Sequence, residues 1–320
     1  MKGKMKNPSN RVLWLDKPYR SLDYEMRNTF GEKLYRITLN AGLTCPNRDG
    51  TLGVGGCIFC SPKGSGDFAG DKLLSISEQL ARGKLSLTNK RDVQSYIAYF
   101  QAFTNTYGEL EVLEKLYLEA MRDEQVKILA IATRPDCLDD NILALLDRMA
   151  KIKPLWIELG LQTIHETTAN YIRRGYSLPI FEEKVKALQS IGIPVIVHVI
   201  LCLPGETTEM MLETIDYLNR LKVQGIKLSL LHILEGTDLA QEYKRNPFWL
   251  PTMEEYFEIL GKCIGRLDPN ITIHRLTGDG PKDLLIAPLW TSAKRTVLNR
   301  LHHYLRENEL WQGKDYVLGE

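Results

Sequence analysis

The stretch GLTCPNRDGTLGVGGCIFCSPKGSGDFAG, residues 42–70, holds three of the six cysteines of this 320-residue chain. Eleven residues separate Cys45 from Cys57 and two separate Cys57 from Cys60, and glycines and polar turn residues fill much of both intervals. Glycine-rich sequence of this kind lets the backbone fold closely around a bound group. Three thiols gathered on one such loop indicate a metal centre or reactive thiols.

The composition limits the classes of protein to which the chain can belong. Hydrophobic residues make up 44% and charged residues 25%, which is typical of a globular protein, and the formal net charge is +1. No apolar run approaches the roughly 20 residues of a membrane span, and the N-terminus lacks the apolar core of a signal peptide. We therefore expect a cytoplasmic protein without a membrane partner, whose thiols stay reduced.

Beyond the cysteine stretch, short apolar runs alternate with helical patterns. Six runs, spaced about 25–35 residues apart after the first, are typical of buried strands: 33–42, 94–103, 127–135, 154–163, 194–205 and 225–234. Helical periodicity follows four of them, at 108–123, 139–152, 180–192 and 207–222. The alternation predicts an α/β fold with a parallel sheet. Because six units fall short of the eight that close a barrel, we predict an open, partial (β/α)6 barrel of the TIM type.

The simplest division of the chain is one catalytic core with two small extensions. We predict a basic N-terminal extension at 1–30, the partial barrel at 31–240, and a C-terminal extension at 241–320 with a strand at 271–280 and a helix at 293–308. The extensions carry the two basic clusters: Lys2, Lys4, Lys6, Arg11, Lys17 and Arg20, then Lys294, Arg295, Arg300 and Arg306. Such charge is most often only solvated, but it also attracts phosphate groups.

Ligands of parallel α/β folds bind at the carboxyl ends of the strands, where the cysteine stretch begins. Polar residues gather at the other predicted strand ends: Gln101, Asn105, residues 133–136, Glu158, Gln162, His198 and His232. A single histidine in an apolar strand, such as His198, is usually a core residue. A set of polar residues at one end of the sheet indicates a binding site instead.

Three cysteines do not complete a structural zinc site, which uses four ligands, and the nearest histidine downstream of them is His165. They also fall short of the four thiolates of a ferredoxin-type cluster. Three thiolates suit a 4Fe–4S cluster in which one iron stays open to a small molecule. A zinc-stabilised RNA-binding module without catalysis is the alternative.

This arrangement resembles the radical S-adenosylmethionine superfamily, in which three cysteines follow the first strand of a partial barrel. The resemblance implies a 4Fe–4S cluster held by Cys45, Cys57 and Cys60, with S-adenosylmethionine bound to the open iron. In that family the reduced cluster cleaves the sulfonium to methionine and a 5′-deoxyadenosyl radical, which requires an electron donor such as flavodoxin or ferredoxin. Phe59, directly before the last cysteine, is then expected near the adenine.

The common first interval in that superfamily is three residues, whereas here it is eleven. Long intervals occur in its Elongator-like branch, and CPNRDGTLGVGGCIFC closely resembles the bacterial YhcC/YtqA family of that branch. The similarity covers nearly the whole chain, from GEKLYRITLNAGLTCPNRDG to WTSAKRTVLNRL.

Further motifs imply contacts with the cosubstrate. ELGLQT and RRGY are similar to motifs of the branch, which assigns contacts to Gln162 and Arg174. His198, six residues before the proline of LPGET, stands where related enzymes often have an acidic residue that touches the ribose. The usual glycine–glycine–glutamate that binds the amino group is replaced by YFQAFTNTY, in which Gln101, Asn105 or Thr104 is the candidate.

The Elongator-like resemblance implies transfer RNA as the substrate. Its wobble uridine lies in a single-stranded loop that can present the base to a pocket. The related bacterial pathway converts carboxymethylaminomethyl-uridine to aminomethyl-uridine, and we expect this modification. A radical enzyme acting on a small metabolite or a protein residue is the alternative. The sequence assigns no catalytic residue that acts on the substrate.

Overall fold

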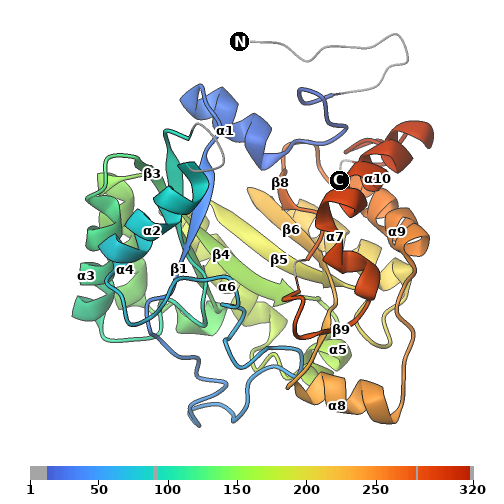
Figure 1. Ribbon diagram of the computed structural model, residues 1–320, viewed down its shortest axis with the longest axis horizontal. Helices are drawn as coiled ribbons and strands as arrows, with labels where there is room; N and C mark the ends of the chain where they lie inside the picture. Colours follow the sequence, from blue (N-terminus) through green and yellow to red (C-terminus); the bar gives the residue numbers. More distant parts are fainter. Residues whose placement is uncertain (1–12, 89–92, 279, 318–320) are drawn as a thin grey trace. The chain divides into compact units, whose positions relative to one another are not determined.

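The computed structural model describes residues 13–88, 93–278 and 280–317, and the chain forms two compact units (Figure 1). The cysteine unit comprises Met26–Gly160 and Arg173–Ile196. The terminal unit comprises Met1–Glu25, Leu161–Ile172 and Val197–Glu320. The units interleave along the chain, and the predicted boundaries at residues 30 and 240 stay a prediction.

All six predicted strands are present, and the strand predicted at 271–280 joins them as a seventh. The strands are β1 (Tyr35–Leu39), β2 (Tyr96–Phe100), β3 (Val126–Thr133), β4 (Leu155–Gln162), β5 (Val195–Leu201), β6 (Gly225–Leu230) and β8 (Thr272–Arg275). The sheet order is β1-β2-β3-β4-β5-β6-β8, so the strands pair in the order in which they follow along the chain. The pairs β1–β2, β2–β3, β3–β4 and β6–β8 are parallel, which confirms the predicted α/β class.

In the cysteine unit, the parallel register aligns the side chains of β1–β4 in rows. Thr38 is paired with Tyr99, Tyr99 with Ala130, and Ala130 with Trp156. Paired residues of parallel strands point to the same face of the sheet. The opposite face is apolar and packs on helices, as where the Phe100 ring meets the ring of Tyr117 edge-on at 5.5 Å.

The helices of the cysteine unit cover that apolar face, and α2, α3 and α4 lie together on one side of its strands (Figure 1). Their bounds are α2 (Ile76–Thr88), α3 (Leu110–Met121), α4 (Asp140–Ile152) and α6 (Leu178–Ser190), with a short 3-10 helix, η1, at Pro135–Cys137. Helices α3, α4 and α6 confirm the predicted periodicity. Helix α1 (Leu22–Phe30) crosses the boundary between the units along the chain.

Helix α2 was not predicted, and a glycine explains why. Gly83 lies near its middle, and glycine inside a helix costs about 1 kcal/mol relative to alanine. In the structure α2 packs directly on β1, and a Cβ atom at Gly83 would come within 2.4 Å of Cγ2 of Ile37. The close approach of helix and strand therefore requires the residue that weakens the helical signal.

The terminal unit contains β5, β6 and β8 and most of the remaining helices. These are α5 (Glu166–Tyr171), α7 (Thr208–Leu221), α8 (Asp238–Arg245), α9 (Met253–Arg266), η2 (Leu289–Ser292) and α10 (Lys294–Glu307), with the antiparallel pair β7 (Ile233–Leu234) and β9 (Leu285–Ala287). Helix α9 was not predicted, although Thr252 and Glu255 form a capping box at its start. No helix in the described ranges combines the length and the apolar character needed to cross a membrane.

Residues 13–21 are held against the C-terminal part of the terminal unit, and we call this contact the terminal clasp. Gln312 has 1% of its surface exposed, and its Oε1 atom accepts a hydrogen bond from the backbone N–H of Arg20 at 2.8 Å. Its amide donates to the carbonyls of Asp268 and Ile271 at 2.7 and 2.8 Å. One buried side chain thus satisfies three backbone groups, and Ser21 also bridges to Ile273.

Candidate active site

The cysteine loop, residues 42–70, follows β1 and contains no helix or strand longer than an isolated bridge. It is nevertheless fixed at several points. The N–H of Gly70 donates to the Thr38 carbonyl at 3.0 Å, and the N–H of Thr104 donates to the Thr44 carbonyl at 3.2 Å. Gly55 and Gly56 have φ angles of +88° and +84°, which side chains disfavour. Glycine thus permits turns that hydrogen bonds then hold.

The three predicted metal ligands, Cys45, Cys57 and Cys60, are free thiols on this loop, and each is half-buried. Burial, followed by the charge of Cys60, raises the pKa of Cys57 to about 12, while the charge of Arg134 opposes the rise. The thiols are therefore near enough to repel one another as thiolates. A bound metal centre removes this penalty because its positive charge stabilises the thiolates.

The donor set of the loop, three thiols on one short stretch of chain, suits a 4Fe–4S cluster that keeps one iron open. The thiolates of a 4Fe–4S cluster bind different irons, so they require proximity without a common centre. The donor set on the loop meets that requirement.

Arg174 lies in the cysteine unit, within a stack of two arginines and a tyrosine. The Tyr176 ring centre is 4.9 Å from each of the guanidinium carbons of Arg134 and Arg174. Arg134 donates to the Arg174 carbonyl at 2.9 Å and pairs with Asp136 at 2.7 Å. The phenol of Tyr176 donates to the carbonyl of Gly160 at 2.6 Å. The stack therefore joins the end of β4 to the RRGY segment.

Asn47 connects this arginine stack to the cysteines. Its amide donates to the Arg173 carbonyl at 2.7 Å and lies 3.7 Å from the sulfur of Cys57. Gly175, at φ +81°, leaves room for it, since a Cβ there would be 3.3 Å from the side chains of both Asn47 and Arg134. Asn47, Arg48 and Tyr176 were not among the predicted site residues, although the first two lie within residues 42–70.

The three candidates for the amino-group contact differ in position. Gln101 is half-buried and donates to the carbonyl of Ser65, whose hydroxyl is 3.9 Å from the Cys60 sulfur. Asn105 is fully buried, and its amide donates to the Phe100 and Ala132 carbonyls at the ends of β2 and β3. Thr104 is 1% exposed. Gln101 is thus the side chain tied to the cysteine loop, and Asn105 holds two strand ends.

Phe59 is half-buried, and it follows the buried Ile58 and precedes the half-buried Cys60 in the chain. Gln162 and His198 belong to the terminal unit, where Gln162 ends β4 at φ +63° and His198 lies half-buried on β5. The structure therefore gathers the cysteines, Phe59, Gln101 and Arg174 in one unit. The contacts of Phe59, Gln101, Arg174, Gln162 and His198 with a cosubstrate stay predictions.

The segment that contains Gln162 is anchored within the terminal unit by Glu206 of LPGET. Burial raises the pKa of the Glu206 carboxyl, and hydrogen bonds with Thr163 and Thr168 oppose that rise. His165, in the same segment, lies 2.8 Å from the carbonyl of Met210 through its Nε2 atom. LPGET thus fixes the residues that follow β4.

A second polar cluster lies on the inner face of β1–β4. Arg36 is 3.2 Å from the carboxylate of the buried Glu158, and its guanidinium lies 5.1 Å from the Tyr99 ring centre. The indole of Trp156 donates to the same carboxylate at 3.3 Å. Glu158, which the sequence singled out at a strand end, is therefore a paired charge in the sheet interior.

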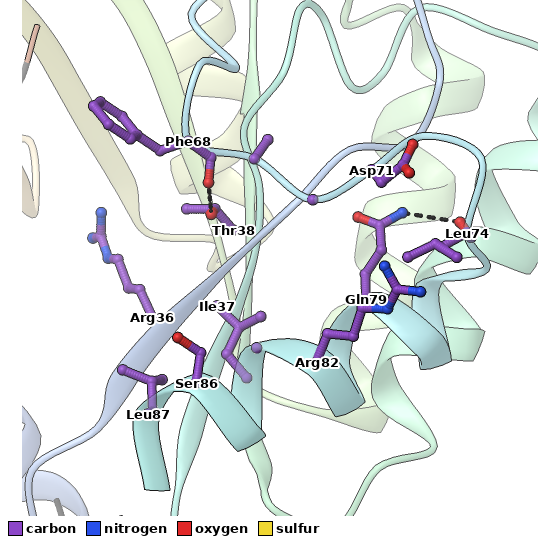
Figure 2. Close-up of a pocket in the computed structure, with 13 residues that line it drawn as sticks. Arg36, Ile37, Thr38, Phe68, Asp71, Leu74, Gln79, Arg82, Ser86 and Leu87 are labelled. Carbon is purple, nitrogen blue, oxygen red and sulfur yellow. Dashed lines mark hydrogen bonds between the residues drawn. The ribbon is translucent and has the colours of Figure 1, made fainter. Parts of the chain in front are cut away.

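A pocket of about 350 Å³ flanks β1 in the cysteine unit. Figure 2 shows Arg36 and Phe68 on one side of the strand and Gln79 and Arg82, from α2, on the other. The hydroxyl of Thr38 donates to the Phe68 carbonyl at 2.6 Å. The three cysteines do not line this pocket, although the last three residues of their loop, Phe68, Ala69 and Gly70, do.

Comparisons with known proteins identify the class to which this fold and loop belong. The family model of the radical SAM superfamily matches residues 44–218, and that of the radical SAM C-terminal domain matches residues 223–307. The chain is 40% identical over 299 residues to the uncharacterized protein YtqA of Bacillus subtilis, covering 93% of each chain. It is 35% identical to the protein YhcC of Escherichia coli, covering 89% of this chain and 91% of that one.

More distant matches point to the Elongator-like branch. A tRNA uridine(34) acetyltransferase of Methanocaldococcus jannaschii is 27% identical over 164 residues, which is 49% of this chain and 29% of that protein. The solved structure of the Elp3 protein of Methanocaldococcus infernus, lacking its N-terminal 46 residues, superposes with a TM-score of 0.66 at 17% identity. The match covers 87% of this chain and 64% of that one, and it confirms the partial-barrel fold.

The chain belongs to the radical SAM superfamily, in its Elongator-like branch, and is a radical SAM enzyme. Its cofactors are a 4Fe–4S cluster and S-adenosylmethionine, as the resemblance implied. When bound, they supply the reductive cleavage of the sulfonium to a 5′-deoxyadenosyl radical. The family match removes the alternative of a zinc module without catalysis.

Proposed function

We propose that this radical SAM enzyme modifies the wobble uridine of transfer RNA and removes the carboxymethyl group from carboxymethylaminomethyl-uridine to leave aminomethyl-uridine. Cys45, Cys57 and Cys60 hold the cluster, and Arg174 and Gln101 orient the cosubstrate, with Gln162 and His198 as further contacts. A flavodoxin or ferredoxin supplies the electron. The match to a tRNA uridine(34) acetyltransferase supports transfer RNA as the substrate.

A basic surface in the terminal unit is the structural observation that carries this proposal. The hydroxyl of Tyr19 lies 2.9 Å from Nε2 of His302, which brings the residues near the N-terminus beside α10. Burial lowers the pKa of His302, and the charges of Lys17 and Arg306 lower it further, while the charge of Asp16 opposes them. Cations from both predicted basic clusters therefore lie around one histidine, a charge pattern that suits RNA phosphates.

Not every residue of those clusters contributes to this surface. Arg20 is paired with Glu25 at 2.7 Å, and Arg300 is paired with Glu254. Arg295 and Arg306 are exposed on α10. The predicted cations Lys2, Lys4, Lys6 and Arg11 lie outside the described residues.

The pocket beside β1 supports a nucleotide substrate independently. Phe68 is 53% exposed and lies beside the pocket with Arg36, while Arg82 lines it from α2 (Figure 2). Proteins stack unpaired bases on exposed aromatic rings and hold their phosphates with cations, and Phe68 and Arg82 are the candidates here because Arg36 is already paired with Glu158. We infer that an unpaired nucleotide of the substrate occupies this pocket.

Mass spectrometry of transfer RNA nucleosides tests the modification. A strain without the gene should accumulate carboxymethylaminomethyl-uridine and lack aminomethyl-uridine. The natural chain should restore the product, and a Cys57→Ala chain should not. An unchanged nucleoside profile in the deletion strain would reject the uridine assignment and favour a small metabolite or a protein residue as the substrate.

Binding tests the proposed RNA surface separately. The paired substitutions Arg295→Gln and Arg306→Gln should weaken binding of transfer RNA at low salt and reduce the slope of log affinity against log salt by about 1–2. Arg122→Gln, an exposed arginine in the cysteine unit, should leave the slope unchanged. Equal slopes for the paired variant and the natural chain would remove α10 from the interface.

A further inference from the structure

Arg48 occupies a slot built into the cysteine loop. Its guanidinium donates to the carbonyls of Cys60 and Ser61 at 2.9 and 2.6 Å. The group therefore lies against the backbone of the third cluster ligand, although Arg48 follows the first ligand by only three positions. Both bonds come from the same outer nitrogen, Nη2, and they hold that end of the guanidinium against the loop.

Gly56, Gly64 and Phe103 shape this slot, and Phe103 does so at a cost to its own backbone. A Cβ at Gly56, where φ is +84°, would lie 2.8 Å from Nε of Arg48. The Phe103 ring centre lies 5.8 Å from the guanidinium carbon of Arg48, and Phe103 itself has a φ of 60°. Gly64 gives that ring room, because a Cβ there would lie 2.2 Å from it. Left-handed backbone at a bulky residue is uncommon and costly, so the slot is specifically maintained.

The charge in this slot is not neutralised by a carboxylate. Within the described part of the chain, the bonds of Arg48 go to backbone carbonyls, and none goes to an acidic side chain. Arg134, another arginine near the cysteines, differs because its Nε and Nη2 atoms donate to the Asp136 carboxylate at 2.9 and 2.7 Å, which offsets its charge.

We propose that Arg48 raises the reduction potential of the 4Fe–4S cluster bound by Cys45, Cys57 and Cys60. Reduction adds one electron and no proton, so the cluster gains one negative charge while a low-potential one-electron donor is oxidised. A fixed cation beside one ligand stabilises the more negative, reduced form more than the oxidised form. Arg48 is thus a tuning residue for the electron transfer that begins the reaction, whatever substrate follows.

The test compares variants that change the charge and the shape separately. Arg48→Gln removes the charge, Arg48→Lys keeps it without the planar fork, and Arg122→Gln removes a remote exposed charge as the control. Each protein is loaded with iron and sulfide without oxygen, its iron content is measured, and the cluster is titrated with reductant while EPR follows the reduced form. This measurement involves no transfer RNA, so it is independent of the proposed substrate.

Arg48→Gln should lower the ratio of reduced to oxidised cluster at a fixed solution potential at least tenfold, equal to about 59 mV for one electron. Arg48→Lys should stay within about threefold of the natural chain, and Arg122→Gln should not change the ratio. A fully loaded Arg48→Gln protein with an unchanged potential would overturn the proposal. Equal shifts in Arg48→Gln and Arg48→Lys would also overturn it, because loop shape rather than charge would then be responsible.

The glutamine variant could also fail to retain the cluster. Replacement of Arg48 by citrulline then decides the question, because citrulline keeps the shape and most of the N–H donors and lacks the charge. A loaded citrulline protein should show the same tenfold loss. An unchanged potential in that protein would reject the proposal.

Discussion

The cysteine loop and the terminal clasp each depend on one long polar side chain that holds irregular backbone. Gln312 bonds to three backbone groups and is 1% exposed, and Arg48 bonds to two backbone carbonyls and is half-buried. The clasp needs only its polar groups satisfied, which a neutral amide does without the cost of burying a charge. The loop is predicted to bind the 4Fe–4S cluster, whose negative charge increases on reduction, and there a cation is proposed to stabilise the reduced form as well.

The largest effect is expected where the loop binds metal. Cys57→Ala should abolish the cluster and the release of deoxyadenosine, because the cluster loses one of its three thiolates. Iron content, the brown absorbance and the nucleoside product measure this after anaerobic reconstitution. Cys263→Ala, a fully buried thiol of the terminal unit, is the matched control and should keep its iron. Loss of iron in both variants would mean that overall folding, not ligation, is measured.

The clasp should respond in stability rather than in chemistry. Gln312→Ala leaves the buried carbonyls of Asp268 and Ile271 without their donor, and we expect the free energy of unfolding to fall by about 3 kcal/mol. Urea denaturation measures the change. Iron content at temperatures where the variant is folded should equal that of the natural chain, and a loss of iron there would contradict the contrast between the two regions.

Substitution of two neighbouring glycines tests whether the Arg48 slot affects retention of the cluster. Gly55→Ala and Gly56→Ala both place a side chain at positive φ, at a cost of about 1–2 kcal/mol. A Cβ at Gly55 meets nothing within 4 Å, whereas one at Gly56 enters the Arg48 slot. Gly56→Ala should therefore lose more iron on reconstitution than Gly55→Ala. Equal iron loading would show that the slot does not matter for cluster retention.

The smallest effect is a pH dependence at the clasp. Burial and nearby cations lower the pKa of His302 below its ordinary value of 6.5. As the pH falls below about 6.5, the unfolded chain takes up the proton more readily than the folded chain, so stability decreases. His302→Gln should therefore lose less stability than the natural chain between pH 7.5 and pH 5.5, as urea denaturation at each pH will measure. Parallel pH profiles would remove His302 as the cause.

The sequence by itself determined the features that depend on short-range patterns. Alternating apolar and helical periodicity gave the strands β1–β6 and the helices α3, α4, α6 and α7, because these patterns repeat within one element. The spacing of three cysteines on a glycine-rich stretch predicted the cluster site, because three thiolates without a fourth ligand restrict the metal chemistry. The same local features gave the superfamily, which the family models then confirmed.

Only the tertiary structure decided the features that depend on residues far apart along the chain. Gly83 weakens the helical signal of α2. A glycine is needed there because any Cβ atom would clash with Ile37 of β1. Arg48 looks like an ordinary turn residue until Gly56 and Phe103 enclose it beside Cys60. Periodicity and spacing are properties of one element. Steric fit and electrostatic interactions depend on residues that meet only in the folded chain, so a local sequence pattern does not predict them.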